Sequence, residues 1–128
     1  MGKKIRILAG GLTVEAVLND SKTAQVIYDG LPIEATVNTW GEEIYFPIPV
    51  KAGLEPGARE VLGLGEIGYW PPGQAFCIFF GRTPASRGDE IRAASAVTVI
   101  GRVLGDPKAF LKVRDGTPIR LEKLDPQA

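Results

Sequence analysis

The sequence has no histidine, only one cysteine and only one methionine among its 128 residues. Without histidine, the chain lacks the usual general base at neutral pH and the commonest metal ligand. A single cysteine cannot form an internal disulfide, which favours a reducing compartment. We therefore expect a cytoplasmic protein with no bound metal and no cofactor.

Long apolar runs and an excess of one charge sign are also missing. No apolar stretch approaches the ~20 residues that cross a bilayer as a helix, so a membrane is not an expected partner. The 15 Lys and Arg residues balance the 15 Asp and Glu residues. They are scattered rather than clustered, which argues against nucleic acid as a partner. A small molecule or a peptide is the expected partner, and a homo-oligomer is left open.

The composition is that of one globular domain. Hydrophobic residues make up 45% of the chain and charged residues 23%, which suits a packed core rather than a disordered segment. The length allows one core, so we predict a single domain over residues 1–128 whose last residues, Asp125 to Ala128, are frayed. The 16 glycines and 10 prolines lie between apolar runs and indicate many turns.

Alternating apolar residues predict about eight strands. Their ranges are 4–8, 12–18, a strand within 37–50, and then 59–64, 65–70, 74–80, 96–104 and 119–121. In the third range, Ile44 and Phe46 should face the core, and Glu43 and Tyr45 the opposite side. In the sixth, around Cys77, both faces are apolar, which predicts the most deeply buried strand.

Two short helices complete the prediction. The first begins at Asp20 or Ser21 and ends with a left-handed Gly30 before Pro32. The second runs from the Asp106-Pro107 pair to Asp115-Gly116. Eight strands with two helices suit a mainly β fold, a closed barrel whose open ends are covered by the helices.

Several strings resemble the cyclophilin-like fold. They are GEIGYWPPGQAFCIFFG at 65–81 and VTVIGRVLGDPKAFLKV at 97–113. More closely, VNTWGEEIYF, GYWPPG, FFGRTP and ASAV are similar to markers of small prokaryotic cyclophilin-like proteins without an assigned activity. This resemblance spans nearly the whole chain and implies a closed eight-stranded barrel with two short capping helices.

The resemblance does not extend to the residues of prolyl isomerases. Those enzymes hold proline in an apolar pocket outside the barrel, beside an arginine and a histidine. This chain has no histidine, its only methionine is Met1, and Cys77 falls where the pocket phenylalanine would stand. No Phe-His-Arg string occurs between Val37 and Gly65. The resemblance therefore predicts the fold without the usual isomerase site.

Seven polar and aromatic residues are candidate ligand contacts: Asn38, Trp40, Glu43, Tyr45, Tyr69, Trp70 and Arg82. The first four lie in a turn and the strand after it, where they can equally form a barrel corner. Tyr69 and Trp70 precede two prolines and can form either a ligand wall or a self-packed turn. Arg82 can bind a carboxylate or phosphate, or remain a solvated surface cation.

The functional prediction is a small-ligand or peptide-binding module, with catalytic residues unknown. One alternative is a divergent prolyl isomerase that uses Arg82 or Arg59. Another enzyme class, hydrolysis or lyase chemistry with Glu42 or Glu43 as base, requires a buried carboxylate with a raised pKa. A third alternative is a structural subunit or interaction module of a larger enzyme, which would present a large apolar surface.

Overall fold

The computed structural model describes residues 2–124 and shows a mainly β fold. The predicted fraying of residues 125–128 lies outside the described residues. Ten strands are present in the described part of the chain: β1 Lys3–Ala9, β2 Leu12–Leu18, β3 Ile33–Thr36, β4 Asn38–Thr39, β5 Glu43–Pro47, β6 Arg59–Leu62, β7 Glu66–Trp70, β8 Ala75–Phe79, β9 Ile91–Val103 and β10 Pro118–Lys123. The helical elements are α1 Lys22–Asp29 and the 3-10 segments η1 Pro71–Gly73 and η2 Pro107–Lys112.

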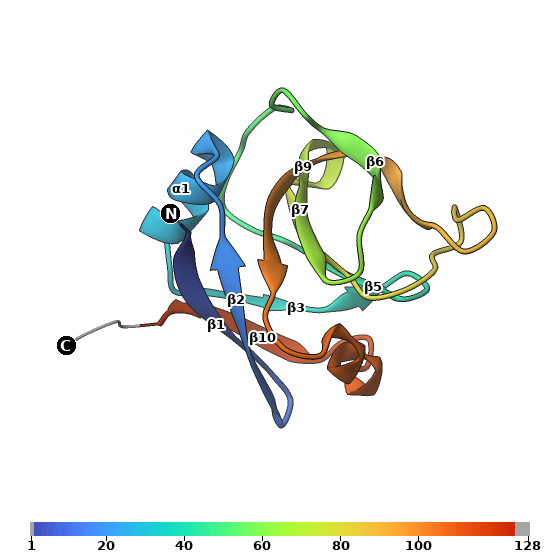
Figure 1. The fold of residues 1–128 in the computed structure, drawn as a ribbon. Helices are drawn as coiled ribbons and strands as arrows, with labels where there is room; N and C mark the ends of the chain where they lie inside the picture. Colours follow the sequence, from blue (N-terminus) through green and yellow to red (C-terminus); the bar gives the residue numbers. More distant parts are fainter. Residues whose placement is uncertain (1, 125–128) are drawn as a thin grey trace.

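The strands form one strongly curved sheet, in the order β3-β10-β1-β2-β9-β7-β8-β5-β4, with β6 paired to β9 beside it. The sheet wraps around a common core (Figure 1). Its two end strands, β3 and β4, follow each other in the chain around Val37, and the described residues show no ladder that closes the order. The predicted closed barrel of eight strands is therefore not confirmed. Strands β3 and β4 have four and two residues, too few to show an alternation in the sequence.

The two predicted main helices are present, but their details differ from the prediction. In α1, Ser21 is the N-cap, and its Oγ accepts a hydrogen bond from the Ala24 N–H at 3.2 Å. Gly30 has φ −91° and is not left-handed as expected. The second helix, η2, is a 3-10 segment that stops at Lys112, earlier than predicted. In Figure 1, α1 lies beside the β1–β2 hairpin and η2 lies at the opposite end of the molecule. No helix in the described range is long and apolar enough to cross a membrane.

Strand β9 pairs with three other strands and begins five residues before the predicted start. Its later part pairs with β2 and β7, whereas its earlier part carries β6 along the outside of the sheet. Gly68 of β7 permits this close crossing, because a Cβ there would lie 2.6 Å from the Cγ2 atom of Val97. The first half of β9 therefore covers the outer face of β7 and β8.

This arrangement creates two apolar clusters. The main core lies inside the curved sheet and includes Ile44, Phe46 and Phe76, all fully buried. The second cluster lies on the outer face, and its buried members are Leu62, Ala75, Cys77, Phe79, Ala93 and Val97. All five residues of β8 are buried, as its two apolar faces predicted, because the strand separates the two clusters.

Candidate functional site

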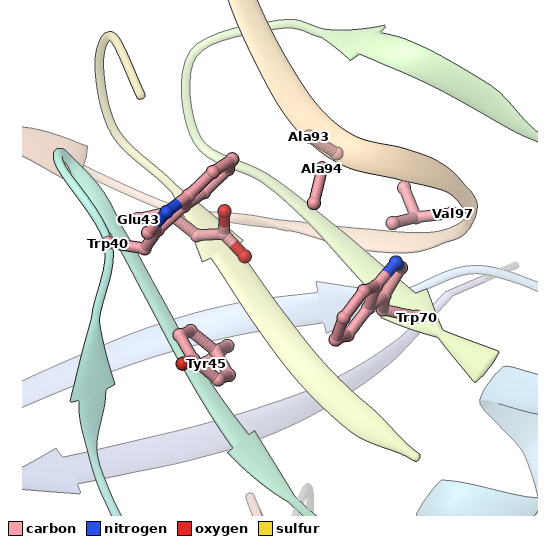
Figure 2. Close-up of a pocket in the computed structure, with 7 residues that line it drawn as sticks. All are labelled: Trp40, Glu43, Tyr45, Trp70, Ala93, Ala94 and Val97. Atoms are coloured by element: carbon pink, nitrogen blue, oxygen red, sulfur yellow. The ribbon is translucent and has the colours of Figure 1, made fainter. Parts of the chain in front are cut away.

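A pocket of about 210 Å³ opens on the outer face of the sheet, next to the second cluster. Three elements and one turn supply its walls: the β4–β5 turn, β5, β7 and the first half of β9. The lining residues are Trp40, Glu43, Tyr45, Trp70, Ala93, Ala94 and Val97 (Figure 2). Four of the seven candidate residues from the sequence thus lie around one cavity.

The alternation of β5 places Glu43 and Tyr45 on the pocket side, because Ile44 and Phe46 face the main core. Trp40 stands in the preceding turn, where its backbone N–H donates to the Glu43 carbonyl at 3.0 Å. Gly41 makes this turn possible with φ +62°. A Cβ at Gly41 would lie 2.8 Å from the Thr83 Cα, so the turn packs directly on the loop that follows β8.

Trp70 ends β7 and forms the opposite wall of the pocket. Its indole Nε1–H donates to the Ser95 hydroxyl at 2.7 Å, which fixes the ring against β9. Gly73 leaves room for the same ring, because a Cβ there would lie 2.8 Å from the Trp70 Cζ3 atom. The indole is thus held by a hydrogen bond on one side and by a close-packed turn on the other.

Among the described residues, Glu43 is the only charged side chain that lines the pocket. Its side chain is buried, with the residue 6% exposed, and its Oε1 atom has no hydrogen-bond partner among the described residues. Burial raises the pKa of Glu43 to about 7, against an opposing contribution from hydrogen bonding with Cys77. The thiol of Cys77 is itself buried, and this burial, together with the charge of Glu43, raises its pKa. At neutral pH the carboxyl group of Glu43 therefore exists in both protonation states.

The neighbouring Glu42 provides a contrast. It points away from the pocket, its side chain is 40% exposed, and its Oε1 atom pairs with Lys108 Nζ at 2.8 Å. Of the two glutamates considered as a possible base, Glu42 therefore lies outside the pocket. Of these two glutamates, only Glu43 is buried and also lines the pocket.

The pocket can bind a group that is flat or apolar and that carries a hydrogen-bond donor. Two tryptophans and a tyrosine supply aromatic surface, and Glu43 supplies one acceptor in an environment of low polarity. In residues 2–124, no group of three or more His, Cys, Asp or Glu side chains could hold a metal ion.

The other three candidate residues lie outside this cavity. Tyr69 is fully buried in the main core, where its hydroxyl donates to the Val50 carbonyl at 2.6 Å and accepts from the Ala52 N–H at 3.2 Å. Asn38 belongs to β4, where it pairs with Tyr45 through the backbone. Arg82 is exposed, and its Nη2 donates to the Ser86 carbonyl at 3.4 Å.

Sequence reasoning missed the wall that β9 contributes. Ala93, Ala94 and Val97 line the cavity, and Ser95 holds Trp70 in place. Their small side chains look like ordinary strand residues, and the predicted strand began only at residue 96. The ASAV string at 94–97 was the available signal, because small side chains allow one strand to cross closely over another.

The comparisons with known proteins agree with this architecture. The chain is similar to the solution structure of the hypothetical protein AF2241 from Archaeoglobus fulgidus, at 38% sequence identity and a TM-score of 0.81. That match covers 96% of this chain and 95% of the archaeal one. No curated protein matches significantly.

A more distant likeness exists to McbB, solved in complex with tryptophan, at 14% identity and a TM-score of 0.69. It covers 97% of this chain but only 45% of McbB, so the chain resembles about half of that protein, in fold alone. The family model described as cyclophilin-like matches residues 3–122. The chain therefore belongs to the cyclophilin-like family.

Proposed function

We propose that this domain binds a small organic ligand, or one side chain of a peptide, in the pocket between β5 and β9. The observation that carries the proposal is the buried Glu43 carboxyl group, which lines a cavity walled by three aromatic side chains. Its Oε1 atom is shielded from solvent and has no hydrogen-bond partner among the described residues. Buried polar atoms are nearly always hydrogen-bonded, so an orphaned acceptor at a cavity indicates a missing donor. The donor would come from the ligand.

The volume of the pocket limits the ligand. Pockets for drug-sized molecules measure roughly 300–1,000 Å³, and this one is about 210 Å³. A single ring or a short branched chain fits that space, and a larger molecule would place only one of its groups inside.

Tryptophan fluorescence offers a direct test, because Trp40 and Trp70 are the only tryptophans of the chain and both line the pocket. We expect compounds from a library of small amines, alcohols, acids and X-Pro peptides to change the emission on binding. Replacing Tyr45 with alanine should weaken each hit about tenfold or more. Tyr28→Ala is the matched control, since Tyr28 is also half-buried but lies beside Lys3 and Lys123, outside this pocket. A library without hits, or hits that ignore Tyr45→Ala, would contradict the proposal.

A divergent prolyl isomerase finds less support in this geometry. Its two candidate arginines do not line the pocket: Arg59 pairs with both carboxylate oxygens of Glu66, at 3.0 and 2.9 Å, and Arg82 contacts the Ser86 carbonyl. An isomerase needs a donor beside the prolyl nitrogen. Catalysis of X-Pro isomerisation in a short peptide, lost in Arg82→Ala or Arg59→Ala, would restore this alternative.

Proton transfer is a second candidate function, favoured by the environment of Glu43. A buried carboxyl group with a pKa of about 7 is the condition stated above for Glu43 as a base, and such a group can both accept and donate a proton at neutral pH. The test is deuterium exchange at an acidic C–H of a bound ligand, followed by NMR in D₂O. Exchange should require Glu43 and persist in Glu42→Gln. Exchange that persists in Glu43→Gln would rule out proton transfer by Glu43.

A role as an interaction module, and the formation of a homo-oligomer, remain predictions. The large apolar side chains that are exposed in the described residues are Val26, Leu54, Val61, Leu64 and Leu111. Light scattering after size exclusion would measure the oligomeric state directly.

A further inference from the structure

The chemistry of the pocket points to one class of ligand. We propose that the ligand is an organic cation, a primary to quaternary ammonium or an amidinium on a small hydrocarbon group, which places its charge between Glu43 and the aromatic walls. This inference rests on the proposed function, since it specifies what the same pocket binds.

The first argument is the unbalanced charge of the site. A carboxylate taken out of water is costly unless it is paired. No lysine or arginine lines the cavity. Two cations near the β4–β5 turn are occupied elsewhere, because Lys108 pairs with Glu42 and Arg82 contacts the Ser86 carbonyl. The compensating positive charge therefore has to come from a proton or from a ligand.

The second argument is the kind of surface that surrounds the carboxylate. In Figure 2, the Glu43 oxygens lie between the rings of Trp40, Tyr45 and Trp70. The N–H of Trp70 is already bound to Ser95, so this side chain offers its ring rather than a donor. Aromatic faces attract cations, and tryptophan attracts them most strongly. Anions would meet both the carboxylate and the negative ring faces.

The third argument concerns competition with protons. The other groups around Glu43 bring no cation: β5 supplies Tyr45, β8 supplies Cys77, β7 supplies Trp70, and β9 supplies only alanine and valine side chains. A proton is therefore the alternative occupant of the same carboxylate. Because burial holds the pKa of Glu43 near 7, an organic cation must displace this proton below neutral pH. Its affinity should rise with pH and level off above about 8.

The test uses three probes of similar shape: benzylammonium, benzyl alcohol and benzoate, titrated at pH 8 against tryptophan emission. We expect benzylammonium to bind at least tenfold more tightly than benzyl alcohol, and benzoate to bind most weakly. The preference for the cation should disappear in Glu43→Gln and persist in the control Glu42→Gln. Thermal unfolding of both variants checks that they fold.

A fixed-charge probe tests the proton competition, because benzyltrimethylammonium does not titrate. Its dissociation constant should fall by close to tenfold per pH unit between pH 5 and 6 and become constant above pH 8. In Glu43→Gln it should not depend on pH.

Equal affinity for benzylammonium and benzyl alcohol, or a cation preference that survives Glu43→Gln, would overturn the inference. In both cases the pocket would still bind ligands, so the proposed function would stand. If none of the probes binds, the inference also fails, and the library screen decides the proposed function separately.

Discussion

The two faces of strand β5 differ in how closely they are packed. Toward the inside, Ile44 and Phe46 are fully buried, and the ring of Phe46 stacks on Phe76 with centroids 5.3 Å apart. Toward the outside, Glu43 and Tyr45 border a cavity. The inner face is packed on all sides by the curved sheet, whereas the outer face is covered only by the first half of β9. The same five residues thus build both the core and the candidate site.

The inner and outer faces of β5 therefore differ in how favourable their surroundings are for the stability of the fold. The inner cluster consists of apolar side chains apart from the Tyr69 hydroxyl, which is hydrogen-bonded. The outer cluster lies beside a buried carboxyl group, one oxygen of which has no hydrogen-bond partner within residues 2–124. Unfavourable groups of this kind persist in proteins mainly where function requires them. Three substitutions would break or sharpen this comparison.

The largest effect should come from the inner face. Phe46→Ala removes a fully buried ring and should lower the free energy of unfolding by about 3–5 kcal/mol. Tyr45→Ala, one residue away on the outer face, should cost only about 1 kcal/mol, because this side chain is half-buried. Urea denaturation of both variants measures the difference. Similar losses would mean that the outer cluster is as much a core as the inner one.

An intermediate effect should come from Glu43 and should depend on pH. Because the folded pKa of about 7 exceeds the ordinary 4.5, the native state holds this proton more tightly than the unfolded chain. Stability should therefore fall as pH rises from about 4.5 to 7, by about 3 kcal/mol in total. In Glu43→Gln, stability should no longer fall with pH over this range. At pH 8 this variant should be more stable than the unsubstituted protein.

The exposed carboxylates act with the opposite sign, in a lower range of pH. Hydrogen bonds to Thr23 and to Arg92 lower the pKa of Glu55 and Glu90, respectively, so their small contributions are lost as pH falls below about 4.5. Between about pH 4.5 and 7, the change of stability with pH is therefore expected to come from Glu43. Glu42→Gln is the control for the substitution itself, and a slope that persists in Glu43→Gln would assign the effect to another group.

The smallest effect should come from the crossing of β9 over β7. Gly68→Ala places a methyl group 2.6 Å from Val97 and should cost roughly 1–3 kcal/mol, because the strands must separate. The same change should widen the pocket and alter tryptophan emission. Gly11→Ala is the control, since nothing lies within 4 Å of its added Cβ. Equal stability of the two variants would show that β9 adapts without strain.

The sequence predicted the mainly β class and most of the strands, because their alternation is long enough to read. It also predicted which face of β5 carries Glu43 and Tyr45. It could not predict β3 and β4, which are too short, nor the early start of β9 at Ile91. The sheet order depends on pairings between distant segments, which alternation does not encode.

The residue types in the sequence correctly indicated four residues that line the pocket. They could not show that Tyr69, another candidate, lies in the core instead. Tyr69 and Trp70 are adjacent and therefore point to opposite faces, one to the core and one to the pocket. Only the pairing of β7 with its neighbouring strands determines that Tyr69 faces the core and Trp70 the pocket. The raised pKa of Glu43 could not be predicted either, because it depends on burial in the folded structure.

The tight packing of Gly41 against Thr83 has a consequence for how this domain can diversify. Trp40 stands next to a glycine that rests on the loop following β8, and the Glu42 N–H donates to the Arg82 carbonyl of that loop at 2.8 Å. Residues 87–89 of this loop are exposed, and the loop projects from the sheet (Figure 1), so insertions at these positions disturb no core residue. A change in its length would nonetheless shift the turn that carries Trp40. Residues that do not line the pocket can thus change its width during evolution.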